Sequence, residues 1–172
     1  MNFPPAGADV SRTGSFTGRS VYLSPQHIPM HGRCADRDNG AMPAAVIEVR
    51  RQYTVDEEIA IIDAVHRALV DAFRIPPEDR NIRLIVHEPH RFGCSPELAH
   101  PEYRTIVNID CFVGRSLNAK RRLYADIVER LGAFGIPGDH VSTILHEIDR
   151  DNWGLGGGQA ASDVELGFTV EV

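Results

Sequence analysis

The sequence predicts an α+β domain in which a β-α-β unit occurs twice in tandem, giving a four-stranded sheet with two helices on one face. Two observations predict this fold. Short β-branched runs alternate with amphipathic stretches, in the same order in both halves of residues 42–172. The halves also share local sequence, because IPPEDRNIRLIVHEPHR at 75–91 resembles IPGDHVSTILHEIDR at 136–150. Right-handed crossovers make the two strands of each unit parallel.

The first unit opens with a short β-branched run, AAVIEVRR at 44–51, which is a strand candidate. Thr54, followed three residues later by Glu57, fits a capping box and predicts the start of a helix. Apolar residues at helical spacing predict one buried face on this helix, made of Val55, Ile59, Ile62, Leu69, Val70 and Phe73. Pro76 and Pro77 cannot continue the helix, and RLIVHEP at 83–89 predicts the second strand.

The second unit repeats this order. TIVNIDCFVG at 105–114 predicts a strand, and Ser116 can cap the helix that follows it. The predicted apolar face of this helix consists of Leu117, Tyr124, Ile127, Val128 and Leu131. VSTILHEI at 141–148 predicts the last strand of the unit. The glycine-rich tail then ends in VELGFTVEV at 164–172, whose alternation predicts a C-terminal β-ribbon, which we expect to pair with a neighbouring subunit.

Residues 1–41 have a different composition, rich in Gly, Pro, Ser and Arg and without a sustained period. Such a segment buries too little apolar surface to offset its ordering entropy, so we expect a disordered extension. A second interpretation is that the mature protein lacks this segment. Residues 42–172 then form the folded domain. The three cysteines form no C-x-x-C pair, and no secretory signal opens the sequence. We therefore expect a cytoplasmic protein.

Charge and spacing exclude several partners. Residues 43–172 carry 14 basic and 21 acidic side chains, a net charge of −7, whereas nucleic-acid modules concentrate Lys and Arg. No stretch approaches the roughly 20 apolar residues of a membrane-spanning helix, so we expect neither a nucleic-acid nor a membrane partner. We also expect no metal or other cofactor, because His87 and His90 would point to opposite faces of a strand. A small anionic substrate remains compatible, since one arginine can bind it.

The family resemblance rests on several features together. Met42-Pro43 directly before a strand, the duplicated unit, and the segments GRSLNAKRRLY, HEIDRDNWGLGGGQAAS and ELGF resemble the tautomerase superfamily. The chain is most similar to two-repeat members such as malonate semialdehyde decarboxylase-like proteins, over residues 42–172 and not over 1–41. The resemblance implies an isomerase, a homotrimeric tautomerase. It would catalyse enol–keto proton transfer on a small keto or unsaturated carboxylic acid, with an N-terminal proline as acid and base.

The resemblance also implies where the site residues lie. Pro43 falls on the catalytic proline, and Arg115 and Asp79 complete the catalytic candidates. Arg115 and Trp153 fall on substrate-binding positions, and Tyr53 lies near a position that holds an arginine in simple tautomerases. The decarboxylase pattern has a second arginine where this chain has Leu117, which leaves decarboxylase or hydratase side activity open.

The chemistry of Pro43 depends on its linkage. A free α-amine has a pKa of about 7.7–8.0, so a nearby cation or modest desolvation makes it the neutral base that proton transfer at carbon requires. Inside a chain, the same nitrogen is a tertiary amide without basicity. We therefore expect the functional product to begin at Met42 or to be cleaved before Pro43. The alternative is a non-catalytic trimeric binding protein in which the extension blocks Pro43.

Each remaining candidate has a structural alternative. Arg115 could hold a substrate carboxylate and offset enolate charge, or it could be a solvated arginine near a helix start. Asp79 could orient water or a substrate hydroxyl, or it could bond the backbone of its own turn. Trp153 could line the pocket or simply belong to the core.

Overall fold

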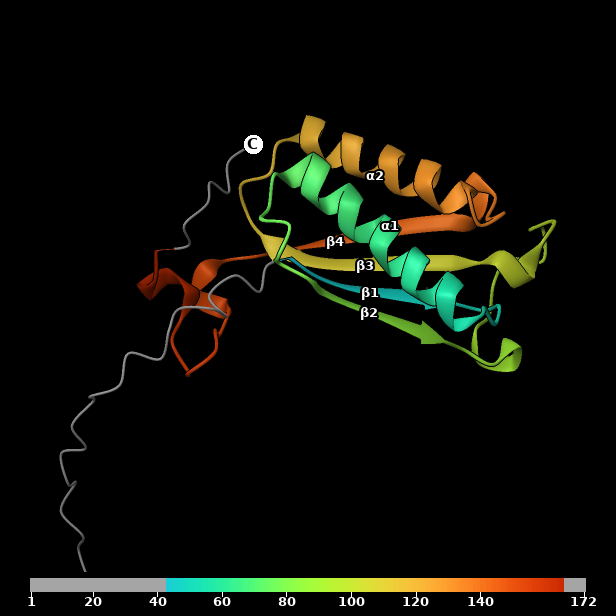
Figure 1. Cartoon of the computed structure of the whole chain (residues 1–172), viewed down its shortest axis with the longest axis horizontal. Coiled ribbons are helices and arrows are strands. Elements are labelled where there is room, and N and C mark those ends of the chain that lie inside the picture. Colours follow the sequence, from blue (N-terminus) through green and yellow to red (C-terminus); the bar gives the residue numbers. More distant parts are fainter. Residues whose placement is uncertain (1–42, 166–172) are drawn as a thin grey trace, which may run out of the picture. The chain divides into compact units, whose positions relative to one another are not determined.

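The computed structural model describes residues 43–165. Both the predicted extension at 1–41 and most of the predicted ribbon, residues 166–172, lie outside the described residues. The principal elements are β1 (Ala44–Val49), α1 (Val55–Phe73), β2 (Asn81–Val86), β3 (Thr105–Phe112), α2 (Leu117–Gly132) and β4 (Val141–Ile148). The strands form one sheet in the order β2-β1-β3-β4, and both helices cover the same face of it (Figure 1).

The strand pairing confirms the predicted tandem β-α-β fold. β1 pairs with β2 in parallel, β3 pairs with β4 in parallel, and the two units join through the antiparallel pair β1 and β3. Because the units run in opposite directions, equivalent parts of the two units lie at opposite ends of the sheet. One end, called here the Pro43 end, collects the starts of β1 and β2, the ends of β3 and β4, the end of α1 and the start of α2 (Figure 1).

Both helices start at the predicted caps. The Glu57 backbone N–H donates to Thr54 Oγ1 at 3.3 Å, and the Thr54 N–H donates to Glu57 Oε2 at 2.8 Å, which completes the capping box. At α2, the Ala119 N–H donates to Ser116 Oγ at 3.1 Å. These bonds satisfy N–H groups that have no partner within the helix.

The predicted buried faces of the helices are partly wrong. Val55 and Ile59 of α1 are 70% and 51% exposed, and Leu117 of α2 is 59% exposed. The residues that α1 buries are Ile61, Val65, His66, Ala68, Leu69, Ala72 and Phe73, and those that α2 buries are Ala119, Leu123, Ile127 and Leu131. Each buried face includes alanines, because small side chains let a helix lie close to the sheet. The predicted faces were chosen by their large apolar side chains, and they therefore included residues that face solvent.

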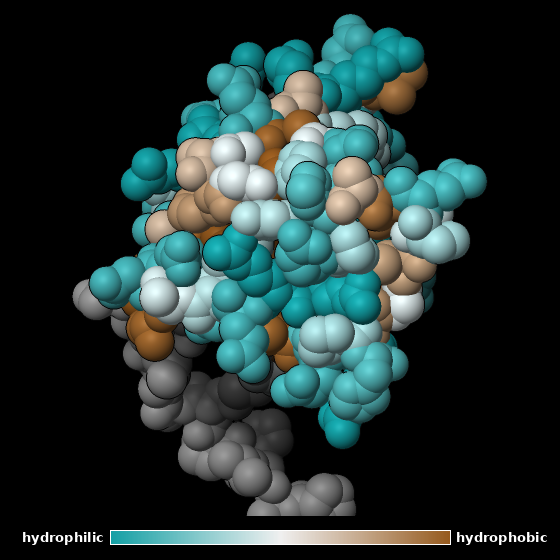
Figure 2. Space-filling view, turned by 90° about the vertical axis from the view of Figure 1, so that its right-hand side faces the viewer, coloured by the Kyte–Doolittle hydropathy of each residue, from teal (hydrophilic) through white to brown (hydrophobic). Residues whose placement is uncertain are grey.

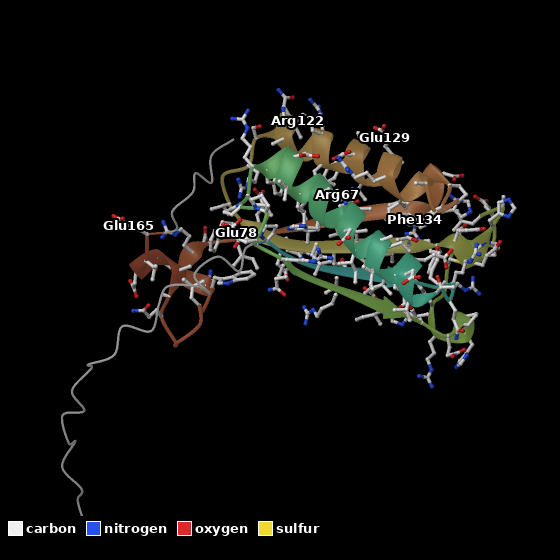
Figure 3. The ribbon with its side chains drawn as sticks, in the orientation of Figure 1. Arg67, Glu78, Arg122, Glu129, Phe134 and Glu165 are labelled. Atoms are coloured by element: carbon white, nitrogen blue, oxygen red, sulfur yellow. The ribbon has the colours of Figure 1, made fainter. Side chains whose placement is uncertain are left out.

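The solvent side of the helices is charged. Arg122 and Glu129 of α2 point away from the sheet (Figure 3) and are exposed. Ion pairs tie the two helices together on this side, because Arg130 contacts both Asp71 of α1 and Asp126 of its own helix, each within 2.8 Å. Among residues 43–165, no helix is long and apolar enough to cross a bilayer.

The same five-residue motif, with one difference, occurs at the carboxyl end of α1 and just after α2. Ala-Phe-Arg-Ile-Pro at 72–76 and Ala-Phe-Gly-Ile-Pro at 133–137 each contain a left-handed residue. Arg74 has a φ of 54°, and its equivalent Gly135 has a φ of 75°. Glycine adopts this conformation without strain, whereas a side chain pays roughly 1–2 kcal/mol for it. The first unit therefore stores strain that the second avoids.

We predict that Arg74→Gly raises the free energy of unfolding, by about 1 kcal/mol at most, because it removes the left-handed strain at the end of α1. Gly135→Ala is the matched change in the other direction. Its Cβ would lie 3.8 Å from the nearest atom, the hydroxyl oxygen of Tyr103, so its cost of about 1 kcal/mol comes from the backbone rather than from crowding. Urea titrations of both variants measure the effects, and a destabilised Arg74→Gly would contradict the prediction.

Candidate active site

Pro43 lies immediately before β1, at one end of this central strand, and is buried. Side chains of a strand alternate between faces, so Pro43 lies on the helix side together with Ala45 and Ile47, which are 1% and 0% exposed. Ala44 pairs with Asp110, and this antiparallel register places Pro43 opposite Cys111 of β3. In the chain as given, the Pro43 nitrogen is bonded to Met42 as an amide.

Arg115 is fixed to the end of α1. It precedes the cap of α2 and is 5% exposed. Its Nη1 donates to the Phe73 carbonyl oxygen at 3.0 Å, and its guanidinium lies 4.8 Å from the centre of the Phe73 ring. The structure therefore does not support the solvated arginine that the sequence left open. Arg115 instead places a cation at the carboxyl end of α1, whose last turn has no basic residue of its own.

The pKa of the Cys111 thiol reflects the burial and the charges beside Pro43. Burial raises the pKa of this thiol to about 11, and the nearby Arg115 charge opposes that rise. Burial also lowers the pKa of Arg115, because the charged form loses solvation. The Arg115 charge therefore acts on Cys111, in the buried region at the end of β1 and β3 where Pro43 lies.

Asp79 lies in the turn between α1 and β2, at the same end as Pro43. Its N–H donates to the Pro76 carbonyl oxygen at 3.0 Å, and the residue is 8% exposed. Its Oδ2 is buried and has no hydrogen-bond partner among the described residues. Burial, with a smaller effect from Glu78, raises the pKa of the Asp79 carboxyl to about 6. Glu78 lies at this end of the domain (Figure 3). The hydrogen bond within the turn is thus made by the backbone N–H of Asp79 and not by its carboxylate.

Trp153 also lies near this end, in the loop after β4. Its ring packs edge-on against Phe112, with the ring centroids 5.8 Å apart, in a small apolar cluster with Leu155 and Ala161. Arg150 closes the loop by donating from Nε to the Ala161 carbonyl oxygen at 3.0 Å. Phe112 belongs to the face opposite the helices, so Trp153 approaches the Pro43 end from the other side of the sheet.

Tyr53 lies at the opposite end of β1. The strand has six residues, so it separates Tyr53 from Pro43 by about 20 Å. There the Arg51 guanidinium stacks on the rings of Tyr53 and Tyr103, and burial raises the pKa of Tyr53. This end of the domain is mostly hydrophilic in Figure 2. Tyr53 precedes the cap of α1 as Arg115 precedes the cap of α2, so the two residues hold equivalent positions in the two units. Because the units run antiparallel, these positions lie at opposite ends of the sheet.

The structure also contains hollows away from these residues. One of about 380 Å³ lies between the outer faces of α1 and α2, and is lined by Asp71, Ala72, Arg122, Ala125, Asp126, Glu129 and Arg130. Its charges are largely paired with each other, and no candidate residue reaches it. Among the described residues, no three His, Cys, Asp or Glu side chains cluster closely enough to share a metal ion. The expected lack of a cofactor stays a prediction.

Known proteins share both sequence and fold with this chain. The family described as tautomerase enzyme matches residues 79–156. FG41 malonate semialdehyde decarboxylase, solved after inhibition by 3-bromopropiolate, is 28% identical, with 69% of this chain and 92% of its own covered and a TM-score of 0.61. The chain is therefore similar in sequence and in fold to proteins of the tautomerase superfamily. No curated protein matches it in sequence.

Two further structures show that the superfamily fold extends over both repeats. A malonate semialdehyde decarboxylase with decarboxylase and hydratase activities is 23% identical, with 71% of this chain and 99% of its own covered and a TM-score of 0.62. An asymmetric trimer of fused 4-OT is 22% identical, with 70% and 97% covered and a TM-score of 0.63. The domain thus has the same fold as these two proteins, over most of the length of each.

The structure places Pro43, Asp79, Arg115 and Trp153 at one end of the domain, and it places Tyr53 at the other end. Sequence reasoning missed two contributors. Phe73 was assigned only to the core, although its carbonyl and ring hold Arg115. Cys111 was not considered, although strand alternation and pairing could have placed it beside Pro43. The contact of Arg115 with Phe73 spans 42 positions and leaves no local sequence signal.

We predict that Asp79→Asn raises the thermal midpoint at pH 8 and that this gain shrinks below pH 4. The folded pKa of about 6 lies above the ordinary value of 3.8, so the folded state holds the proton more tightly than the unfolded chain. Stability is therefore full below about pH 4 and falls as pH rises through 6. Asparagine does not ionise and escapes this loss.

Asp139→Asn is the control for this experiment, because the bond to His140 lowers the pKa of Asp139 and reverses the sign. This variant should gain nothing at pH 8. Thermal unfolding followed by circular dichroism at both pH values measures the difference. An Asp79→Asn midpoint equal to or below wild type at pH 8 contradicts the assignment.

Proposed function

We propose that this domain is a tautomerase when its chain begins at Pro43. It moves a proton between oxygen and carbon of a small enol or keto acid, or of an unsaturated carboxylic acid. The observation that carries the proposal is the position of Pro43 at the buried start of the central strand β1, opposite Cys111, where the Arg115 charge acts. The match to the tautomerase family supports it.

The Pro43 nitrogen serves as the base and then the acid. As a free secondary amine it would start from a pKa of about 7.7–8.0, and both the Arg115 charge and burial disfavour its protonated form. The neutral amine accepts a proton from the substrate hydroxyl or carbon and returns it to the other position. The ring restricts the direction of the nitrogen, and the strand pairing of Ala44 fixes the position of the residue.

Arg115 and Asp79 serve the substrate. The guanidinium of Arg115 holds the substrate carboxylate and offsets negative charge on the enolate. The Asp79 carboxyl, with a pKa near 6, is partly protonated just below neutral pH and can donate or accept a hydrogen bond to a substrate oxygen or water. Trp153 forms an apolar wall. Tyr53 contributes only if a neighbouring subunit brings it to the Pro43 end.

Tautomerisation is favoured here over decarboxylation. Leu117 stands where the decarboxylase pattern has its second arginine. Because leucine is uncharged, it cannot bind a substrate carboxylate, and its side chain is 59% exposed. The homotrimer and the cytoplasmic location also remain proposals, supported respectively by the trimeric fused 4-OT structures and by the free thiols of Cys94 and Cys111. A non-catalytic trimeric binding protein is the alternative if the extension stays attached.

The first test compares the full chain with a chain that begins at Pro43. We expect only the shorter chain to accelerate ketonisation of phenylenolpyruvate, followed by ultraviolet absorbance, and to sediment as a trimer. Pro43→Ala in the shorter chain should lower kcat/KM by about 10²- to 10⁴-fold, the usual effect of losing a general acid or base. Intact mass of the natively expressed protein shows which chain the cell contains. Equal activity of the full chain, with its amide at Pro43, rules out the proposed base.

The second test addresses Arg115 in the chain that begins at Pro43. Arg115→Ala should raise KM about 10- to 100-fold, since a hydrogen bond to a charged group contributes roughly 1.5–3 kcal/mol. Arg115→Lys keeps the charge but loses the planar guanidinium and its stacking on Phe73. Its KM should therefore lie between those of the wild type and Arg115→Ala. Arg121→Ala, which removes an exposed arginine of α2, is the control. The thermal midpoint separates lost binding from lost folding, and an unchanged KM in folded Arg115→Ala contradicts the role.

A further inference from the structure

His66 is a buried polar residue of α1 to which neither the family resemblance nor the proposed chemistry assigns a role. It is 8% exposed and lies seven residues, about two helical turns, before Phe73. Its Nε2 lies 3.1 Å from the backbone carbonyl oxygen of Asp79. A carbonyl oxygen only accepts, so Nε2 carries the hydrogen and donates it.

This bond fixes the backbone that carries the Asp79 carboxyl. The peptide groups of Asp79 are held on both sides, because its N–H donates to Pro76 at 3.0 Å and its carbonyl accepts from His66. The first bond lies within the turn, whereas the second ties the turn to α1. His66 is therefore a buried polar link between the Asp79 turn and α1, beside the more exposed ion pair of Arg80 with Asp63.

The carboxyl that this backbone carries is unusually dependent on its position. Asp79 Oδ2 is buried without a hydrogen-bond partner among the described residues. Of the charged neighbours, Glu78 acts on the Asp79 carboxyl, and Arg80 is paired with Asp63 of α1. Among residues 43–165, no ion pair holds the Asp79 carboxyl in place, so its burial depends on where the turn is anchored.

We propose that His66 is a positioning residue, which holds the Asp79 carboxyl in its buried place at the Pro43 end by anchoring the Asp79 carbonyl to α1. The same helix holds Arg115 through Phe73, so α1 aligns both side chains. The consequence for catalysis rests on the proposed function, whereas the consequence for the Asp79 carboxyl does not. A merely structural His66 would affect stability and leave the titration of Asp79 unchanged.

Two amide substitutions test the anchor. The side-chain nitrogen of His66→Gln is as many bonds from Cα as Nε2 is, so it can donate to the Asp79 carbonyl. That of His66→Asn stops at the position of Nδ1 and cannot reach it. The pair therefore differs in reach while both side chains stay polar and uncharged. His66→Leu, which removes the donor altogether, is the third variant.

The first measurement needs no catalysis and uses the full chain. Carbon-13 NMR follows the aspartate carboxyls against pH, and Asp79→Asn assigns the signal. Wild type should titrate near pH 6, His66→Gln within about half a unit of it, and His66→Asn and His66→Leu at least one unit lower, as the freed turn moves the carboxyl toward water. A wild-type titration in folded His66→Asn overturns the proposal. If His66→Leu does not fold, the Gln and Asn pair decides.

The second measurement uses the chain that begins at Pro43. His66→Asn should lower kcat/KM about 10- to 100-fold and move the pH–rate profile with the carboxyl, because a displacement of about 1 Å costs up to 10²-fold. His66→Gln should stay within about threefold of wild type. An inactive wild-type chain refutes the proposed function, and the titration still decides the role of His66. An active chain whose His66→Asn variant keeps its rate and profile refutes the positioning role in catalysis.

Discussion

The carboxyl end of α1 is the physical constraint on which the candidate site depends. A helix leaves its last carbonyl groups without partners inside the helix, and these groups must be satisfied when they are buried. Here the Arg74 N–H closes back on the Val70 carbonyl oxygen at 2.9 Å, and the guanidinium of Arg115 meets the Phe73 carbonyl oxygen. Because Arg115 comes from the second unit, this contact joins the two halves of the chain at the point where Pro43 enters the sheet. The helix end thereby orients the cation, and the cation in turn stabilises the helix end.

The internal repeat explains why the turns after α1 and α2 have the same geometry and yet lie far apart. The turn after each helix closes with the same bond, from Asp79 to Pro76 and from His140 to Pro137, at 3.0 and 2.9 Å. Both turns bury a titratable side chain, yet one is a carboxyl and the other an imidazole. Since the units run antiparallel, these turns lie at opposite ends of the sheet. The two ends have thus acquired different chemistry on one backbone design. The Pro43 end combines a proline, a buried carboxyl and a buried arginine.

Burial gives this end its chemical character. The pKa values of Asp79 and Cys111 are raised mainly because their charged forms would lose solvation, to about 6 and about 11 respectively. The Arg115 charge opposes that effect at Cys111. The same two influences would act in one direction on an amine at Pro43, because desolvation and a neighbouring cation both disfavour ammonium. The environment therefore suits a neutral amine, and the covalent state of Pro43 decides whether such an amine exists.

The amino-acid sequence by itself determined the element order, the helix starts and the duplicated unit, because caps, periodicity and repeated segments are local signals. It also named Pro43, Asp79 and Arg115 as a set. Only the tertiary structure decided that Val55, Ile59 and Leu117 face solvent, that Tyr53 lies at the other end of the sheet, and that Phe73 and His66 hold Arg115 and Asp79. These facts depend on contacts between residues distant in the chain and on the antiparallel joining of the two units. No local pattern encodes them, because each follows from how two elements meet rather than from the sequence of either.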